Sequence, residues 1–201
     1  MLFDDTYKTI KTSSEGIFKD KGSKFITYLY PIRSEAEIKN IIANLKSLHP
    51  KARHHCWAMR LSPDRTVFRI NDDGEPSGTA GRPILNTLLS YELTDVLVVV
   101  VRYFGGTLLG VPGLINAYKT ATIEAIKHSE IIVNTINLVC RIDFDHIRMN
   151  EVMKIIKEEY LRILNQHFDL KCSMDLEIRQ SMSNKISGRL QKIEGLNLKF
   201  L

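Results

Sequence analysis

Three acidic side chains stand close together in the segment Asp72–Leu85, whose sequence is DDGEPSGTAGRPIL. Asp72, Asp73 and Glu75 could ligate Mg²⁺, which prefers carboxylate oxygens, or could supply an acid and base pair. The alternative is a structural turn, in which an aspartate accepts hydrogen bonds from the backbone amides that follow it and Gly74 takes a positive φ. The turn is the preferred interpretation, and no residue is assigned to a metal.

A second candidate is the run Arg53-His54-His55-Cys56, because paired histidines beside a thiol could bind a metal or take up a proton. Adjacent residues of a strand point to opposite faces of the sheet, so these side chains cannot all converge. The pattern therefore predicts one buried and one solvated histidine at the start of a strand. The three cysteines of the chain form no CxxC pair, so their spacing supports neither a disulfide framework nor a zinc site.

The third candidate is a pair of glycine-rich segments, SGTAGRP and FGGTLLGVPG, each of which precedes a predicted helix. Exposed N–H groups at two helix N-termini could bind an anion, and Arg82, Arg102 or Lys119 would add positive charge. The alternative is that glycine is needed only because strand and helix pack too closely for a side chain. Both interpretations stay open.

Several well-defined catalytic signatures are absent from the sequence. It contains no GxxxxGK[ST] phosphate loop, no GxGxxG after a strand, no HExxH and no GxSxG. The familiar nucleotide-binding, metalloprotease and esterase classes therefore lose support.

These candidates must be positioned by the elements of an N-terminal domain. The apolar run Val96–Val101 does not alternate, which predicts a strand buried on both faces at the centre of a sheet. Ser34 and Glu37 form a capping box that opens a helix ending near His49. Further strands are predicted at 7–18 (interrupted by SSEG), 24–32, 55–61 and 66–70, the last two joined by the turn Ser62-Pro63-Asp64, and further helices at 80–91 and from 114 onward.

The pattern changes after Thr135. The strand signals at 136–144, 161–168, 170–178 and 197–201 are interrupted by two helices, the first capped by Asp145 and including Ile147, the second opened by Ser183. Strict alternation places one set of apolar residues on a single face of the third strand: Leu170, Cys172, Met174, Leu176 and Ile178. The order β-α-β-β-α-β predicts a ferredoxin-like domain with one open sheet face. The predicted domains are 1–134 and 135–201.

Composition and charge limit the function classes. The 201 residues are 44% hydrophobic and 25% charged, as in ordinary globular proteins. The net charge of +5 is evenly spread, with 17 basic against 14 acidic residues before Thr135 and 11 against 9 after it, so neither half is a dedicated nucleic-acid binder by charge alone. No apolar run approaches the ~20 residues that span a bilayer, and the N-terminus lacks a signal peptide. A cytoplasmic location without membrane association is expected.

The motif DDGEPSGTAGRPIL, followed by VVVVRYFGGTLLGVPGLINAY, closely resembles the signature of the YigZ/IMPACT family, and KGSKFITYLYPI and HHCWAMRL match its pattern too. The resemblance covers nearly the whole chain. It implies an α+β protein of two domains: an N-terminal α/β sandwich similar to a small-subunit ribosomal protein and to the fourth domain of elongation factor G, and a ferredoxin-like C-terminal domain similar to that factor's last domain.

The resemblance also implies a role in translation. Eukaryotic members are implicated in translational control, where they compete for an activator of a kinase that phosphorylates an initiation factor, and they carry an extra RWD domain. Nothing before Tyr7 could encode that domain, so this chain resembles the bacterial type, for which the kinase-regulating role is not assumed.

The preferred hypothesis is a non-enzymatic RNA- or ribosome-associated factor without a cofactor, and with a possible protein partner in translational control. Its phosphate contacts would lie on the sheet face of the first domain or in a cleft between the domains. The alternatives are an enzyme acting on a small or phosphorylated substrate at a site formed by Asp72–Leu85 and Gly105–Gly113, and a protein-interaction module that uses the open sheet face of the second domain. The predicted binding residues are Arg53, His55, Asp73, Glu75, Ser77, Thr79, Arg82, Arg102, Gly105, Gly106 and Lys119.

Overall fold

The computed structural model describes residues 5–63 and 66–201, which form two compact units. One unit is Tyr7–Asn134, and the other is Thr135–Leu201 together with Asp5 and Thr6. Both units combine helices with antiparallel sheets, so the α+β class with two domains is confirmed. The detailed likeness to ribosomal and elongation-factor domains stays a prediction.

The first unit is built around a five-stranded sheet in the order β2-β3-β6-β4-β5. The strands are β2 (Ser14–Asp20), β3 (Ser23–Pro31), β4 (His54–Leu61), β5 (Val67–Asn71) and β6 (Val96–Tyr103). Strand β6 is central, and every residue from Val96 to Val101 is 0% exposed, as its valine run predicts.

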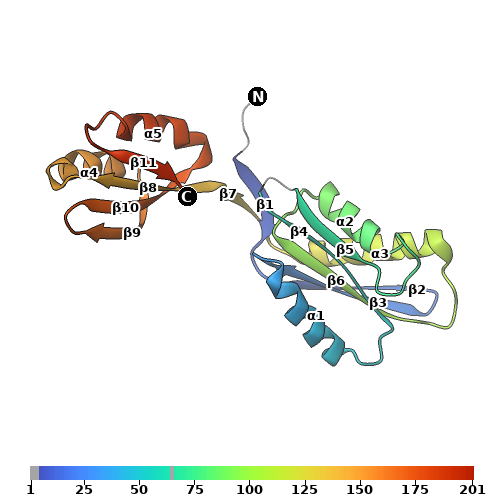
Figure 1. Cartoon of the computed structure of the whole chain (residues 1–201). Helices are drawn as coiled ribbons and strands as arrows, with labels where there is room; N and C mark the ends of the chain where they lie inside the picture. Colours follow the sequence, from blue (N-terminus) through green and yellow to red (C-terminus); the bar gives the residue numbers. More distant parts are fainter. Residues whose placement is uncertain (1–4, 64–65) are drawn as a thin grey trace. The chain divides into compact units, whose positions relative to one another are not determined.

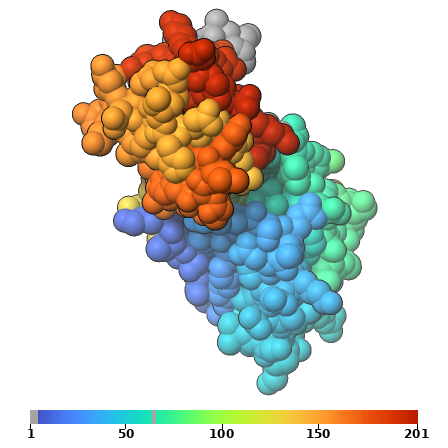
Figure 2. All heavy atoms as spheres, turned by 60° about the vertical axis from the view of Figure 1, so that its left-hand side comes forward, coloured from blue at the N-terminus to red at the C-terminus, as the bar shows by residue number. Residues whose placement is uncertain are grey.

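Helices cover both faces of this sheet (Figure 1). Helix α1 (Ala36–Leu48) packs on the face that carries Leu97, Val99 and Val101, and forms much of the surface drawn in blue in Figure 2. Helices α2 (Gly81–Ser90) and α3 (Gly110–Lys127) pack on the face that carries the alternate residues of β6. The strand thus contributes to two cores because successive side chains of a pleated strand alternate between faces.

Three predictions for this unit need correction. The predicted strand 7–18 is two strands, because β1 (Thr6–Ile10) pairs with β7 (Ile131–Thr135) in a sheet of its own, and β7 was not predicted. The interruption lies at residues 11–13, and most of SSEG belongs to β2.

The predicted capping box forms only one of its two hydrogen bonds. Glu37 accepts the Ser34 backbone N–H at 2.9 Å, but no side chain caps the N-terminus of α1. Asp64 of the predicted turn lies outside the described residues.

The second unit has the predicted order of elements, β-α-β-β-α-β. These are β8 (Asn137–Phe144), α4 (Met149–Glu158), β9 (Arg162–Phe168), β10 (Cys172–Arg179), α5 (Ser183–Leu190) and β11 (Asn197–Phe200), and the sheet order is β11-β8-β10-β9. The alternation along β10 buries Cys172, Met174, Leu176 and Ile178 beneath α4 and α5.

Two residues predicted to lie in this core are exposed. Leu170 is 98% exposed because β10 begins only at Cys172. Ile147 is 84% exposed because it lies in the short 3₁₀ turn His146–Arg148, before α4 begins. Asp145 precedes that turn, and its side chain makes no capping hydrogen bond.

Candidate functional site

The two glycine-rich segments are joined by a buried ion pair. Glu75 lies in the loop after β5, and Arg102 lies at the end of β6; Arg102 Nη1 donates to Glu75 Oε1 at 2.6 Å. The two side chains are only 4% and 6% exposed. Tyr118 of α3 donates its hydroxyl proton to the same oxygen at 2.7 Å. Two predicted binding residues thus meet here, with Tyr118 as a third member that the sequence reasoning missed.

Arg102 makes further contacts. Its guanidinium carbon lies 5.4 Å from the Phe25 ring centroid and 5.7 Å from that of Phe104, within the range of cation–π attraction. Its Nη2 atom lies 3.4 Å from Ser23 Oγ. Its Nε atom is buried and has no hydrogen-bond partner among the described residues. The protein therefore leaves one donor of this buried cation unsatisfied.

A buried thiol extends the network beneath Glu75. Cys56 Sγ lies 3.2 Å from the Tyr118 hydroxyl and 3.0 Å from the carbonyl oxygen of Asp72. Burial raises the pKa of the Cys56 thiol and of the Tyr118 hydroxyl. Both groups therefore keep their protons at neutral pH, and Tyr118 can donate to Glu75.

Asp72 caps the N-terminus of α2. Its carboxylate accepts hydrogen bonds from the backbone N–H groups of Gly78 (2.9 Å), Ala80 (3.1 Å) and Gly81 (2.8 Å). A carboxylate at this end of a helix also interacts favourably with the helix dipole. At α2 the chain's own Asp72 thus occupies the position that the anion-binding interpretation, left open above, would give to a ligand.

The two histidines follow the alternation of β4, and both form a hydrogen bond with Asp73. His55 is buried on the face covered by α1, and burial lowers the pKa of its imidazole. The backbone N–H of His55 donates to Asp73 Oδ2 at 2.7 Å, whereas His54, partly exposed, donates from Nδ1 to the Asp73 carbonyl oxygen at 2.9 Å. His55 is buried as predicted, whereas His54, which was predicted to be solvated, is partly exposed. His55 lies on the face opposite Arg102, so the two do not share a site.

The glycines of the two segments serve two structural purposes, close backbone packing and positive φ angles. A Cβ atom at Gly105 would lie 1.9 Å from the carbonyl carbon of Gly22, so close backbone packing requires glycine there. Gly78 and Gly106 have φ of +78° and +85° with open space around them. These two are required by backbone conformation.

The remaining two loop residues differ in exposure. Ser77 is exposed. Thr79 is 2% exposed, and its hydroxyl donates to the Pro76 carbonyl oxygen at 2.6 Å. Thr79 thus stabilises the turn and does not face a ligand.

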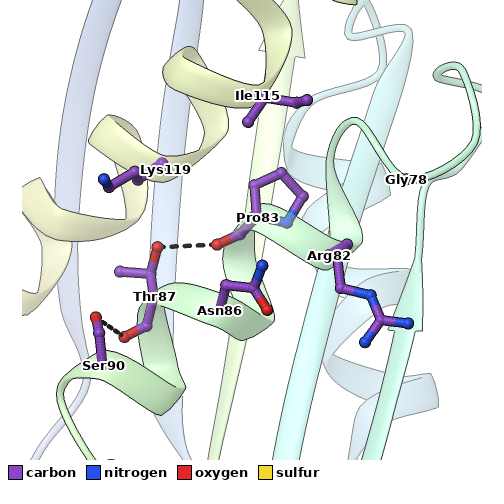
Figure 3. Close-up of a pocket in the computed structure, with 8 residues that line it drawn as sticks. All are labelled: Gly78, Arg82, Pro83, Asn86, Thr87, Ser90, Ile115 and Lys119. Carbon is purple, nitrogen blue, oxygen red and sulfur yellow. Dashed lines mark hydrogen bonds between the residues drawn. The ribbon is translucent and has the colours of Figure 1, made fainter. Parts of the chain in front are cut away.

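Arg82 and Lys119 line one pocket of about 330 Å³, which we call the α2–α3 groove. Both side chains are exposed, and neither forms an ion pair with a carboxylate of the described residues. Figure 3 shows the Arg82 guanidinium and the Lys119 ammonium at opposite ends of the groove, with Pro83, Asn86 and Thr87 between them. Gly78, Ser90 and Ile115 complete the lining.

A second pocket, of about 370 Å³, adjoins the buried ion pair, and we call it the Arg102 pocket. It is lined by Arg53, His54, Glu75, Pro76, Arg102, Phe104, Leu108, Leu109, Gly110, Val111 and Leu114. Of the predicted residues it collects Arg53, Glu75 and Arg102. The apolar lining was missed, although apolar residues within the glycine-rich FGGTLLGVPG loop were a signal that could have indicated it.

The described residues hold neither a metal-binding cluster nor a membrane-spanning helix. Within residues 5–63 and 66–201, no group of three or more His, Cys, Asp or Glu side chains could hold a metal ion. No helix in these ranges is long and apolar enough to cross a membrane.

Comparisons with known proteins match most of the chain to one family. The family model "Impact N-terminal domain" matches residues 21–126. An IMPACT family member of Haemophilus influenzae is 35% identical over 180 residues, which is 85% of this chain and 87% of the relative. The IMPACT family member YvyE of Bacillus subtilis is 30% identical over 182 residues, which is 90% of this chain and 84% of the relative. A crystal structure described as that of a hypothetical protein matches with a TM-score of 0.72 at 25% identity and covers 98% of this chain and 97% of that one.

Proposed function

Since this chain belongs to the IMPACT family, we propose that it is a cytoplasmic, non-enzymatic RNA- or ribosome-associated factor with a role in translational regulation. The translational role is the one that the family resemblance implies. A protein partner in that process is compatible with the proposal.

The observation that carries the proposal is the α2–α3 groove. Arg82 and Lys119 are cations that the protein does not neutralise, because no ion pair joins them to a described carboxylate. Their charged ends lie at opposite ends of one groove (Figure 3). Two cations that line one groove can contact more than one phosphate of a nucleic-acid strand.

The carboxylates support a role without catalysis. Asp72 and Asp73 accept backbone N–H bonds, and Glu75 is held by Arg102 and Tyr118. A general base needs a free lone pair within reach of its substrate. Asp72 instead serves the turn, as the structural interpretation predicts, Asp73 joins the loop to β4, and Glu75 serves the core.

The interaction-module alternative gains no support from the open sheet face of the second unit. That face carries Arg141, Ser173 and Asp175 on paired strands, and Arg141 and Asp175 form an ion pair at 2.7 Å. A docking surface for a stable partner usually has a larger apolar patch.

The proposal is tested by binding of purified protein to ribosomes and structured RNA over a salt titration. The test variant is Arg82→Ala, Lys119→Ala. The control variant is Lys39→Ala, Lys51→Ala, which removes the same charge from two exposed residues of the first unit. If each mutated cation contacts one phosphate, the slope of log K against log salt falls by about 1.4–1.8 in the test variant and is unchanged in the control.

Two results would contradict the proposal. One is the absence of binding by the wild type even at low salt. The other is an equal fall of the slope in both variants, which would show that only the overall charge matters.

A further inference from the structure

The Arg102 pocket is a built site with a fixed floor. The floor is formed by the Glu75–Arg102 pair and the Tyr118 hydroxyl. These side chains are buried and hydrogen-bonded to one another, so they hold the floor in one arrangement. Its volume of about 370 Å³ lies within the range of about 300–1,000 Å³ typical of small-ligand pockets. The pocket can therefore accept one ring-sized group without rearrangement.

The charge around this pocket favours an anion. Glu75 is the one carboxylate among the described residues that line the pocket, and it is already paired with Arg102. Arg53 is exposed and forms no ion pair with the described residues. Gly110 and Val111 belong to the first turn of α3, which has no acidic residue and no side-chain cap. The partial positive charge at the N-terminus of α3 thus adds to the positive charge of Arg53. The Nε atom of Arg102 is itself buried and has no partner among the described residues, so it lies behind the pocket wall, and the accessible cation of the pocket is Arg53.

The walls of the pocket favour an aromatic group. Phe104 is 39% exposed, and the Arg53 guanidinium carbon lies 5.9 Å from its ring centroid. Leu108 is 82% exposed and Val111 is 52% exposed, so both present apolar surface at the rim. Unstacked bases in single-stranded RNA pack on aromatic rings and on arginine guanidinium planes.

We infer that the Arg102 pocket receives one unstacked nucleotide of single-stranded RNA. The base packs between the Phe104–Arg53 pair and Leu108, and the phosphate lies near Arg53 and the first turn of α3. The inference rests on the proposed function, but it adds a preference for single strands, which the α2–α3 groove alone would not produce.

The test measures binding of the full chain to a labelled 12-nucleotide oligouridylate and to a 12-base-pair RNA duplex by fluorescence anisotropy. The variants are Phe104→Ala and Leu108→Ala. The control is Phe68→Ala, which removes an exposed phenylalanine that does not line this pocket. Leu108→Ala guards against misfolding, because its side chain is exposed and its loss leaves no cavity.

Phe104→Ala is expected to weaken oligouridylate binding by about 5- to 150-fold, as one lost stacking contact does. Leu108→Ala gives a smaller loss, and neither variant changes the salt slope, because neither side chain is charged. Binding of the duplex stays within twofold of wild type, since its bases cannot enter the pocket. Phe68→Ala binds both RNAs as the wild type does.

The failures can be told apart. If the wild type binds RNA but both pocket variants bind oligouridylate as tightly as the wild type does, the pocket serves another partner, such as an acidic peptide, and this inference is wrong. An equal loss on both RNAs would also overturn it. If the wild type binds neither RNA nor ribosomes, the proposed function itself is wrong.

Discussion

The buried pair of Glu75 and Arg102 makes a quantitative prediction about stability. Replacing Glu75 with alanine removes the 2.6 Å bond from Arg102 and the 2.7 Å bond from Tyr118, and leaves a guanidinium that is 6% exposed without its counter-ion. Breaking a buried pair from one side destabilises a protein by about 3–5 kcal/mol. The total stability of a domain is about 5–15 kcal/mol, so Glu75→Ala should remove at least about a fifth of the stability of the first unit.

The assay is urea unfolding followed by tryptophan fluorescence. Trp57 is the only tryptophan of the chain and lies in β4, so its signal reports on the first unit alone. The matched control is the double variant Glu75→Met, Arg102→Met, which removes both charges and keeps apolar volume. Replacing both partners of a buried pair is often neutral or stabilising. We expect the free energy of unfolding of the double variant to lie within about 1 kcal/mol of the wild-type value, or above it.

The reasoning fails if Glu75→Ala lowers the free energy of unfolding by less than about 1 kcal/mol, as a solvated pair would. It also fails if the double variant is no more stable than Glu75→Ala. In that case the loss would come from packing and not from the unpaired charge.

Three further predictions concern single residues. Asp72→Ala should destabilise the first unit by about 1–2 kcal/mol through loss of the α2 cap, with a smaller loss for Asp72→Asn, measured by the same fluorescence assay. Hydrogen bonds from Arg179 hold the pKa of the Asp5 carboxyl below its ordinary value of 3.8. The stability that Asp5 adds to the second unit is therefore present above pH 3.8 and is lost as the pH falls further. In acid unfolding followed by circular dichroism, Asp5→Asn should accordingly lose less stability below pH 3.8 than the wild type does. Gly105→Ala should destabilise the first unit by about 3 kcal/mol, because its Cβ would meet the backbone of Gly22; an urea midpoint equal to that of wild type would show that the loop can move aside.

Local periodicity in the sequence determined the order of elements and the cores. The run Val96–Val101 predicts the central strand, and the alternation from Cys172 to Ile178 predicts a strand with one buried face. These predictions succeed because the pleat of a strand acts over two residues and is insensitive to what lies farther along the chain. Where an element begins is less local, so Ile147 and Leu170, at element ends, were wrongly placed in the core.

The sequence also determined which segments form the site, but not what each side chain does there. Only the tertiary structure decided which of the two aspartates caps α2, and that Glu75 pairs with Arg102. Glu75 and Arg102 are 27 residues apart along the chain, and the sheet order β2-β3-β6-β4-β5 brings them together. Side-chain periodicity carries no information on which strands become neighbours, and this is the physical reason that the ion pair and the Arg102 pocket could not be derived from the sequence.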